Sequence, residues 1–562
     1  MKLRYYQEEA VASVFDYFHN NAGNPIIAMP TGTGKSVVIA ELCRKIRSQY
    51  PGQRIMMLTH VKDLIEQNFD KLLTIWPTAP AGIYSAGIGR RDTKNGILYA
   101  GIQSVANNPD SFGHIDLIII DECHRVSHKD DTSYLLVIEA LKKINPYLKV
   151  IGLSATPWRV GLGLLTNGKI FTDICYDITQ MEDFNRLLDE GYLSYLIPKK
   201  TSMEYDLSNV RTTGGDYNRG DLDKEIAKKD LTRNALDETV TYAELYDRHH
   251  WMVFCTSINH CLQVADILEE YGISYAMAHS KQTNAQNDQA IEIFKQGKVT
   301  ALINMDKLTT GFDAPHVDLL CILRPTKSVG LWVQILGRGT RVVYASGYPL
   351  ETPQQRLQAI AAGPKPNCLV LDFAGNTGRL GPINAPVIPD PKKRRKGGNS
   401  AGAPIRVCQA KLPNGLICNT QVHFSVRRCP ECGTEFPVSI NLLETASDKA
   451  LIASSKDLED QKRLEWFNVV NVTYSRHLKD GRPDSIRVTY HCGLRRFTDF
   501  LCFDHGGAAK AEARQWWRKR SEWEPPPSVD EALKYLHTVA TPSRIEVWIN
   551  RKYPRITDYA FR

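Results

Sequence analysis

An α/β fold with a buried parallel sheet is predicted for the N-terminal part of this chain, with smaller modules after it. The stretch "PIIAMPTGTGKSVVIAELCRKI" (25–46) runs from an apolar strand through a glycine-rich turn into an amphipathic helix. The stretch "LIIIDECH" (117–124) is an apolar strand that ends in two carboxylates. Four cysteines within residues 408–432 indicate a separate small module. A length of 562 residues exceeds what one hydrophobic core usually supports, so three or four domains are expected.

The composition is ordinary for a globular protein, with 43% hydrophobic and 23% charged residues. No apolar run approaches the roughly 20 residues needed to cross a bilayer, so no membrane partner is expected. The N-terminus carries acidic and polar residues where a secretory signal needs an apolar stretch, which predicts an intracellular protein. Many of the 13 cysteines lie in apolar runs and fit reduced core thiols. The formal charge of +8 is mild evidence for a polyanionic partner and does not decide the function.

The glycine-rich turn has the residues of a phosphate-binding loop. Gly32 and Gly34 would let backbone N–H groups surround phosphate oxygens, with Thr31 and Thr33 beside them. Lys35 would reach the β- and γ-phosphates of ATP, and Ser36 would offer its hydroxyl to Mg²⁺. Met29 replaces the first glycine of the usual pattern, although the phosphate-binding half is intact. The alternative is a glycine-rich turn that merely opens an ordinary helix.

The second strand places Asp121 and Glu122 at the carboxyl edge of the sheet, where α/β folds bind ligands. Asp121 would hold Mg²⁺, and Glu122 would orient and deprotonate the water that attacks the γ-phosphate. Cys123 and His124 next to them suggest two other sites, a zinc site and a cysteine nucleophile. A zinc site needs further ligands at suitable spacing, and a nucleophile would leave the phosphate loop without its Mg²⁺ partner. Cys123 is therefore interpreted as a packing residue.

These two segments resemble motifs I and II of superfamily 2 helicases, and other segments resemble the remaining motifs in the same order. They are "LRYYQEEAV" (3–11), "MLTHVKDLIEQ" (57–67), "GIQSV" (101–105), "GLSATPWR" (152–159), "VFCTSINHC" (253–261), "LTTGFDAP" (308–315) and "QILGRGTR" (334–341). The resemblance covers roughly residues 1–375. Within the superfamily, the pattern of motifs is similar to that of the motor subunits of type I and III restriction enzymes and of phage and bacterial repair helicases. It implies two tandem RecA-like parallel-sheet domains with ATP between them, in the cytoplasm of a bacterial cell or a phage-infected host.

The resemblance also implies roles for individual residues. Arg4 would stack on the adenine and Gln7 would read its edge, while Gly311 would form a tight turn and Asp313 would sense ribose or phosphate. Arg338 and Arg341 would stabilise the transferring phosphoryl group from the second domain. Gln334 and His124 would bridge the domains, and His124, Ser154 and Thr156 would couple hydrolysis to movement. Contacts with the sugar-phosphate chain, which carry no sequence information, are expected at Thr59, His60, Gln103, Ser104, Thr256, His279 and Thr309.

The predicted domains are 1–198 and 199–376, a basic linker rich in glycine and proline at 377–403, a zinc ribbon at 404–440 and an α+β domain at 455–562. The linker contains the basic run 392–396, which is a phosphate clamp, a localisation signal or simply a solvated charge cluster. Cys408, Cys418, Cys429 and Cys432 have the spacing of a structural Zn²⁺ site, with "CPECG" as a tight knuckle. The first pair is more widely spaced than usual, and His423 is a substitute ligand for Cys418.

The last domain is predicted to contain three strands, "FNVVNVTYSRH", "SIRVTYHC" and "RRFTDFLCF", as a meander, with a turn at residues 481–483. Two helices are expected after them, "AAKAEARQWWRKR" and "SVDEALKYLHT", the second capped by Ser528 and Glu531. Trp516 and Trp517 beside the cations at 518–520 either stack on bases or pack in the core. The domain either binds nucleic acid or docks a replication or repair protein.

An ATP- and Mg²⁺-dependent helicase or translocase is the predicted function, acting on single-stranded, forked or duplex DNA in replication, recombination or repair. The alternatives are a motor subunit of a restriction or remodelling complex that moves on duplex DNA without separating its strands, and an RNA helicase. A nucleic-acid scaffold that does not use ATP is disfavoured because Lys35, Asp121, Glu122, Arg338 and Arg341 are all present.

Overall fold

A computed structural model of the chain describes residues 3–126, 133–159, 163–213, 215–226, 229–305, 314–387, 405–424, 426–436, 464–478, 483–493, 495–549 and 554–561. The chain divides into two compact units, 1–438 and 439–562, which are described separately. The first contains two large sheets and the cysteine-rich module, and the second contains two small sheets. No helix among the described residues is long and apolar enough to cross a membrane.

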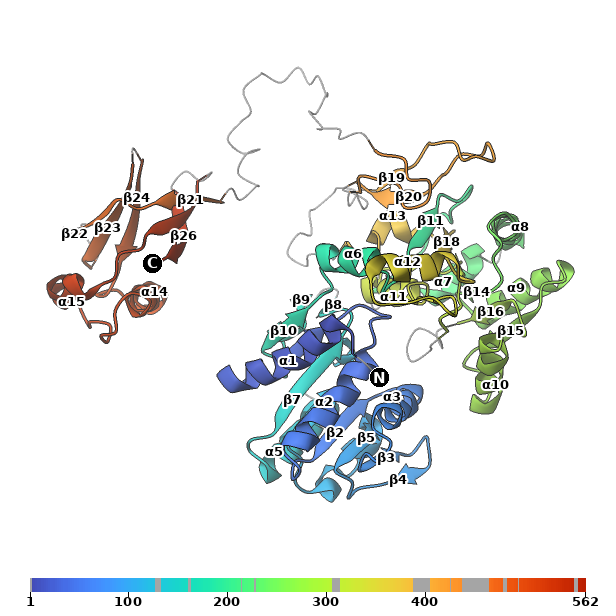
Figure 1. Ribbon diagram of the computed structural model, residues 1–562, viewed down its shortest axis with the longest axis horizontal. Helices are drawn as coiled ribbons and strands as arrows, with labels where there is room; N and C mark the ends of the chain where they lie inside the picture. The colour runs from blue at the N-terminus through green and yellow to red at the C-terminus, as the bar shows by residue number, and fades with distance from the viewer. Residues whose placement is uncertain are drawn as a thin grey trace, which may run out of the picture. The chain divides into compact units, whose positions relative to one another are not determined.

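The first sheet has eight strands in the order β10-β1-β7-β6-β2-β5-β3-β4 (Figure 1, blue to teal). They are β1 (Pro25–Ala28), β2 (Ile55–Thr59), β3 (Ala81–Ser85), β4 (Arg90–Arg91), β5 (Ile97–Gly101), β6 (Leu117–Ile120), β7 (Lys149–Ser154) and β10 (Asp173–Asp177). All neighbours are parallel except β3 and β4. Its helices are α1 (Tyr5–Asn20), α2 (Lys35–Gln49), α3 (Lys62–Ile75), α4 (Ile102–Ala106), α5 (Ser133–Ile144) and α6 (Met181–Asp189), and β8 (Trp158–Arg159) pairs with β9 (Gly163–Leu164).

Both faces of this sheet are buried, which explains why its central strands are continuous apolar runs. Ile26 packs in one hydrophobic cluster while Ile27, the next residue, packs in another, because successive side chains of a strand point to opposite faces. Met56 and Met57 divide in the same way between the two clusters. A parallel sheet covered on both faces needs such runs, so the buried sheet predicted from "PIIA" and "LIII" is confirmed.

The second sheet has six strands, all parallel, in the order β11-β18-β17-β14-β16-β15 (Figure 1, teal through green to yellow). They are β11 (Leu196–Lys199), β14 (Trp251–Phe254), β15 (Tyr275–Ala278), β16 (Ala301–Asn304), β17 (Leu319–Ile322) and β18 (Cys368–Asp372). The helices are α7 (Arg219–Ile226), α8 (Lys229–Leu245), α9 (Ile258–Glu270), α10 (Asn284–Lys295), α11 (Val329–Leu336), α12 (Pro353–Ala361) and α13 (Asn376–Leu380), and β12 (Thr212–Thr213) pairs with β13 (Asp216–Tyr217).

Two tandem parallel sheets therefore confirm the predicted α/β fold class. The predicted limit at residue 198 falls inside β11, which pairs with β18 of the second sheet, and the domain limits as a whole stay predictions. The cysteine-rich module contributes β19 (Ile405–Val407) and β20 (Gln421–His423), an antiparallel pair. Most of the predicted linker, including the basic run 392–396, lies outside the described residues.

The second unit has two antiparallel sheets where the sequence predicted one. The predicted meander is confirmed as β22 (Asn471–His477), β23 (Ser485–Cys492) and β24 (Arg495–Leu501), and residues 481 and 482 of its turn lie outside the described residues. The residues "FN", expected in the first strand, belong instead to β21 (Leu464–Asn468), which pairs with β25 (Arg544–Trp548) and through it with β26 (Arg555–Ala560). The predicted helices are α14 (Gly507–Arg518) and α15 (Val529–Tyr535), and Ser528 Oγ caps α15 by accepting from Glu531 N–H at 3.3 Å.

Candidate active site

The loop between β1 and α2 needs glycine at two positions. Gly32 and Gly34 have φ of +87° and +84°, a left-handed conformation that other residues rarely adopt. A Cβ on Gly34 would lie 2.7 Å from Gln7 Nε2, and one on Gly32 would lie 3.2 Å from the Arg341 side chain. Thr33 Oγ1 donates to the Pro30 carbonyl oxygen at 2.7 Å and so closes the turn. The loop therefore has the compact shape expected of a phosphate cradle.

Lys35 begins α2, directly after this loop, and Ser36 follows it half-buried in the first turn. Lys35 Nζ lies 3.4 Å from the carbonyl oxygen of Met29 and 3.5 Å from that of Pro30. Its positive charge acts on both Asp121 and Glu122, which places the amine between the loop and the carboxylates. This position agrees with the one predicted for an amine that reaches nucleotide phosphates.

Gln7 and Arg4, the two predicted adenine contacts, are held by other residues. Gln7 is buried, its Nε2 donates to the Thr33 carbonyl oxygen at 2.9 Å, and its Oε1 accepts from Arg4 N–H at 3.1 Å. The Arg4 guanidinium lies over the ring of Tyr192, 4.9 Å from its centroid, and donates to the Tyr6 hydroxyl at 2.8 Å. Gln7 thus supports the phosphate loop directly, and the base-binding roles of both residues stay predictions.

The two carboxylates after β6 have different surroundings. Asp121 is buried and accepts from Asn68 Nδ2 and from Glu122 N–H, both at 2.9 Å. Burial and the Glu122 charge raise the pKa of Asp121. Burial also acts to raise the pKa of Glu122, but Lys35 and His124 outweigh it and the net pKa is lowered. Glu122 also has a φ of 51°, a strained backbone of the kind that is concentrated at functional sites.

A chain of close polar contacts leads from Glu122 to the second sheet domain. His124 Nε2 lies 2.9 Å from Gln334 Nε2, which comes from α11 of the second sheet domain. The amide N–H donates to Nε2, which leaves the ring proton on Nδ1. Nδ1 lies 3.0 Å from Ser154 Oγ and 3.3 Å from Glu122 Oε2, and Ser154 Oγ accepts from Thr156 N–H at 3.0 Å. The structure therefore brings together the four residues predicted to couple and bridge the domains, namely His124, Ser154, Thr156 and Gln334.

The segment after α11 approaches the phosphate loop closely. A Cβ on Gly337 would fall 1.9 Å from Thr31 Oγ1, so only glycine permits this contact. Thr340 Oγ1 donates to the Thr31 carbonyl oxygen at 3.4 Å, and the Arg341 side chain lies against Gly32. Arg338 is close enough for its charge to lower the pKa of Glu122. Both predicted arginines therefore come from the second domain and face the loop and carboxylates of the first.

Lys365 is a residue that sequence reasoning missed. It is 1% exposed, and its Nζ donates to the carbonyl oxygens of Arg341 at 2.7 Å and Pro315 at 3.0 Å. Burial lowers its pKa to about 8. The amine thus ties the backbone at Arg341 to the end of the "LTTGFDAP" segment. A lysine in the stretch "GPKPNC" gives no motif that could have indicated this contact.

The predicted nucleic-acid contacts are less well supported. The side chains of Thr59, Ser104, Thr256 and His279 are buried, and Ser104 Oγ and Thr256 Oγ1 form hydrogen bonds with Ala86 N–H and His260 Nδ1. Burial in this conformation gives no support to side-chain contacts with a polymer, and the role of all four residues stays a prediction. Gln103 is exposed and His60 is half-buried. Thr309, Gly311 and Asp313 lie outside the described residues.

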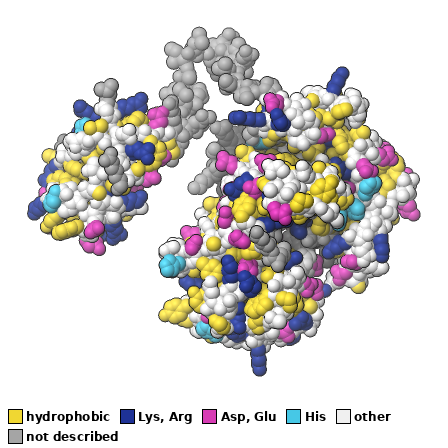
Figure 2. All heavy atoms as spheres, viewed as in Figure 1, with side chains coloured by type: hydrophobic (Ala, Val, Ile, Leu, Met, Phe, Trp, Pro, Cys, Tyr) yellow, Lys and Arg dark blue, Asp and Glu magenta, His cyan; other side chains and the backbone are white. Residues whose placement is uncertain are grey.

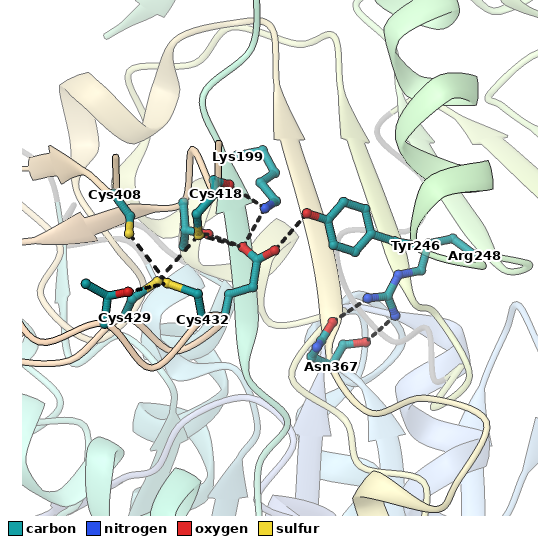
Figure 3. Close-up of polar contacts among 11 residues, drawn as sticks. Lys199, Tyr246, Arg248, Asn367, Cys408, Cys418, Cys429 and Cys432 are labelled. Carbon is teal, nitrogen blue, oxygen red and sulfur yellow. Dashed lines mark hydrogen bonds and ion pairs between the residues drawn. The ribbon is translucent and has the colours of Figure 1, made fainter. Parts of the chain in front are cut away.

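The four predicted zinc ligands come together in the cysteine-rich module (Figure 3). Their Sγ atoms all lie within 4.8 Å of one another, and none forms a disulfide. The Sγ atoms of Cys408 and Cys432 are 3.6 Å apart and those of Cys418 and Cys429 are 3.7 Å apart. Four sulfurs about 2.3 Å from a tetrahedral zinc ion lie roughly 3.8 Å from one another, so the cluster fits Zn²⁺. Cys418 belongs to the cluster, and His423 is not needed as a substitute.

The knuckle of this module is fastened to the second sheet by a buried ion pair. Lys199, at the end of edge strand β11, is 1% exposed and donates from Nζ to Glu431 at 2.5 Å and to the Cys418 carbonyl oxygen at 2.6 Å. Tyr246 donates to the same carboxylate at 2.7 Å, and Figure 3 shows the Lys199 amine and the Tyr246 hydroxyl next to the cysteine cluster. The module also bonds to the edge strand, since Lys200 N–H donates to the Asn419 carbonyl oxygen at 2.9 Å. The cysteine-rich module therefore covers an otherwise open sheet edge.

Residues 1–159 match the family described as "Type III restriction enzyme, res subunit", and residues 232–343 match "Helicase conserved C-terminal domain". The putative ATP-dependent helicase IRC3 of Saccharomyces cerevisiae is 25% identical over 69% of this chain and 53% of that protein. The type I restriction enzyme EcoAI endonuclease subunit of Escherichia coli is 23% identical over 60% of this chain and 44% of that protein. A 51.5 kDa protein of a Lactococcus phage is 25% identical over 78% of this chain and 87% of that protein. The chain thus spans about half the length of the first two relatives.

Proposed function

We propose that this chain is an ATP-dependent helicase or translocase of superfamily 2 that acts on DNA, because residues 1–159 match the res-subunit family and residues 232–343 match the helicase C-terminal family. The observation that supports this most strongly is the chain of contacts between the two sheet domains. Gln334 and His124 join them at 2.9 Å, and Gly337 and Thr340 meet Thr31 of the phosphate loop. A nucleotide bound at this loop would lie where both domains reach it.

ATP is the substrate of the proposed reaction, and Lys35 binds its β- and γ-phosphates. Ser36 and Asp121 would hold a Mg²⁺ ion, which would neutralise charge on the phosphates. Glu122, whose lowered pKa keeps it ionised, accepts the proton of the attacking water. Arg338 and Arg341 stabilise charge on the transferring phosphoryl group, an effect worth roughly 10³ to 10⁵ in rate in comparable enzymes. The residues fit these ligands because the loop is a glycine cradle near one buried and one half-buried carboxylate.

We propose DNA and not RNA as the polymer because the matches include the res family and a restriction-enzyme subunit. A phage or bacterial setting is part of the same proposal, and the match with the phage protein supports it. A role in replication, recombination or repair is proposed from the resemblance of the motifs alone. Zn²⁺ in the cysteine cluster has a structural role, because four thiolates leave no open position for substrate. The role of Gln103 and His60 in contacting the sugar-phosphate chain is likewise proposed.

A second candidate is a motor subunit of a restriction or remodelling complex that moves on duplex DNA without separating strands. It is favoured by the same two restriction-enzyme matches. One panel distinguishes the candidates, namely ATPase rate and strand separation on single-stranded, forked and duplex DNA and on RNA. Stimulation with strand separation supports the helicase, and stimulation by duplex without separation supports the translocase. If no polymer stimulates the ATPase, both proposals are wrong.

Gln334→Ala is expected to reduce polymer-stimulated ATP turnover by about tenfold, because it removes the hydrogen bond that joins the domains through His124. The basal rate without polymer should stay within about twofold, since Gln334 contacts neither the phosphate loop nor the carboxylates directly. Steady-state ATPase assays with and without DNA measure both rates. Gln358→Ala, an exposed position on α12, is the matched control. An equal fall in both rates would show that Gln334 acts in catalysis and not in coupling.

A further inference from the structure

Helix α14 of the second unit has a row of cations on one side. Lys510, Arg514 and Arg518 follow one another at intervals of four residues, which places them on one face of a helix. With Gly507, Ala511 and Gln515 they line a shallow hollow of about 360 Å³. Arg514 and Arg518 are exposed, and Lys510 is half-exposed. We call these three residues the α14 basic face.

The opposite side of α14 is core, so of the two interpretations of Trp516 and Trp517, base stacking and core packing, the structure shows core packing. Trp516 is 7% exposed and Trp517 is 1% exposed, and Trp516 Nε1 donates to the Tyr490 hydroxyl at 3.2 Å. Arg520 is also buried, with its guanidinium 4.2 Å from the ring centroid of Trp516 and 3.8 Å from that of Tyr559. None of these three can bind a polymer, so any contact with nucleic acid must use the basic face.

The charge of the basic face is not balanced locally. Among the described residues, no carboxylate lies within 4 Å of the charged atoms of Lys510, Arg514 or Arg518, and Lys510 Nζ instead donates to the Pro527 carbonyl oxygen at 3.4 Å. Residues 464–562 contain 17 basic and 12 acidic side chains, a formal +5 of the +8 of the whole chain. Lysine and arginine are prominent on the face of this unit seen in Figure 2. Such a field attracts a polyanion.

An exposed aromatic pair is formed by Trp523, in the loop after α14, and Tyr535, at the end of α15. The chain leaves the C-terminal end of α14 and returns to Pro527, which contacts Lys510 in the first turns of the same helix. Trp523 in this returning loop is 62% exposed and stacks on Tyr535, which is 39% exposed, with ring centroids 5.9 Å apart and planes at 25°. A tryptophan this exposed gains little from packing in the free protein, whereas a nucleobase could cover it.

We propose that the α14 basic face and the Trp523–Tyr535 pair form a second nucleic-acid site, outside the motor, which binds single-stranded nucleic acid. The three cations hold successive phosphates, and a base stacks on Trp523. Cationic grooves combined with aromatic platforms bind single strands without sequence preference, because every base has a π-face. This proposal deepens the proposed function by naming the form of the polymer, although binding at this site does not require ATP.

The test uses the full-length protein without nucleotide and measures fluorescence anisotropy of a labelled oligothymidylate and of a blunt duplex of equal length. The triple variant Lys510→Ala, Arg514→Ala and Arg518→Ala should bind the oligothymidylate about tenfold or more weakly. Its slope of log affinity against log salt should fall by about 2, since each lost phosphate contact on a single strand contributes about 0.7. Trp523→Ala alone should lower the affinity for the single strand by about fivefold or more and leave the affinity for the duplex unchanged.

A matched triple variant, Arg487→Ala, Arg495→Ala and Arg496→Ala, removes the same charge from exposed positions on β23 and β24. An equal loss of affinity in this control would overturn the proposal, because net charge alone would then explain the effect. An equal loss on single strand and duplex would overturn the single-strand assignment. Failure of the motor proposal would be a different result. In that case no polymer would stimulate the ATPase, while binding of oligothymidylate would still depend on the α14 basic face.

Discussion

Lys35→Ala is expected to lower ATP turnover by at least about 100-fold, both with and without DNA. The amine is the one cation of the phosphate loop itself, and its charge acts on Asp121 and Glu122 together. Removing it leaves the phosphates without their closest positive charge in a site where preorganised charges are worth several kcal/mol. It also leaves the charges of two adjacent carboxylates less well compensated. We expect the variant to lose more in the rate of hydrolysis than in the affinity for nucleotide.

The control for this variant is Lys45→Ala, a half-exposed position on the same helix. Lys45→Ala should hydrolyse ATP at the normal rate, and both variants should unfold at a temperature within a few degrees of the wild type. Release of inorganic phosphate under saturating ATP gives the rates. Turnover by Lys35→Ala near the wild-type value would overturn the assignment of the loop as the ATP site.

The sheets and the loop could be predicted because their signals are local. "PIIA" and "LIII" are buried on both faces and must be apolar throughout, and the two glycines between β1 and Lys35 adopt conformations that other residues avoid. The carboxylates follow their strand directly, so the strand end places them at the sheet edge. Each inference needed only residues close together in the sequence.

What could not be predicted depends on pairs that are distant in sequence. Lys199 and Glu431 are 232 residues apart, and neither position carries a pattern that names its partner. Lys365 reaches the carbonyl oxygen of Arg341 from a loop with no motif. In the second unit, β21 pairs with β25 across about 80 residues, so the sequence showed one sheet where there are two.

The predicted nucleic-acid contacts depend on burial, which residue type does not reveal. Thr59 and Ser104 have the residue type of a phosphate contact, but residue type does not state whether a side chain faces solvent or core. Thr59 is wholly buried, and Ser104 Oγ holds the Ala86 N–H inside the domain. Trp516 and Trp517 show the same ambiguity, since their helical neighbours are cations while their own side of α14 faces the core.

The double variant Cys429→Ser and Cys432→Ser is expected to lose about one equivalent of bound zinc per chain and to unfold the cysteine-rich module. Zinc contributes roughly 10 to 16 kcal/mol to the folding of small zinc peptides, and two ligands are too few to hold it. Because Glu431 lies between the two cysteines, unfolding of the knuckle would also break the ion pair between Glu431 and Lys199. A buried charge that loses its partner costs roughly 3 to 5 kcal/mol, so the second sheet domain should be destabilised as well.

The loss of zinc and the loss of the Lys199–Glu431 ion pair can be separated by measuring Glu431→Gln beside the double variant. The measurements are metal analysis and thermal unfolding of the full chain. Glu431→Gln keeps all four thiols and should retain zinc, yet it weakens the ion pair with Lys199 and should still lower the unfolding temperature of the motor. Cys175→Ser with Cys502→Ser, two half-buried cysteines outside the cluster, is the matched control and should retain both zinc and stability. If the Cys429 and Cys432 variant keeps its zinc, the cluster is not the metal site. If it loses zinc without destabilising the motor, the module does not support the edge of the second sheet through β11.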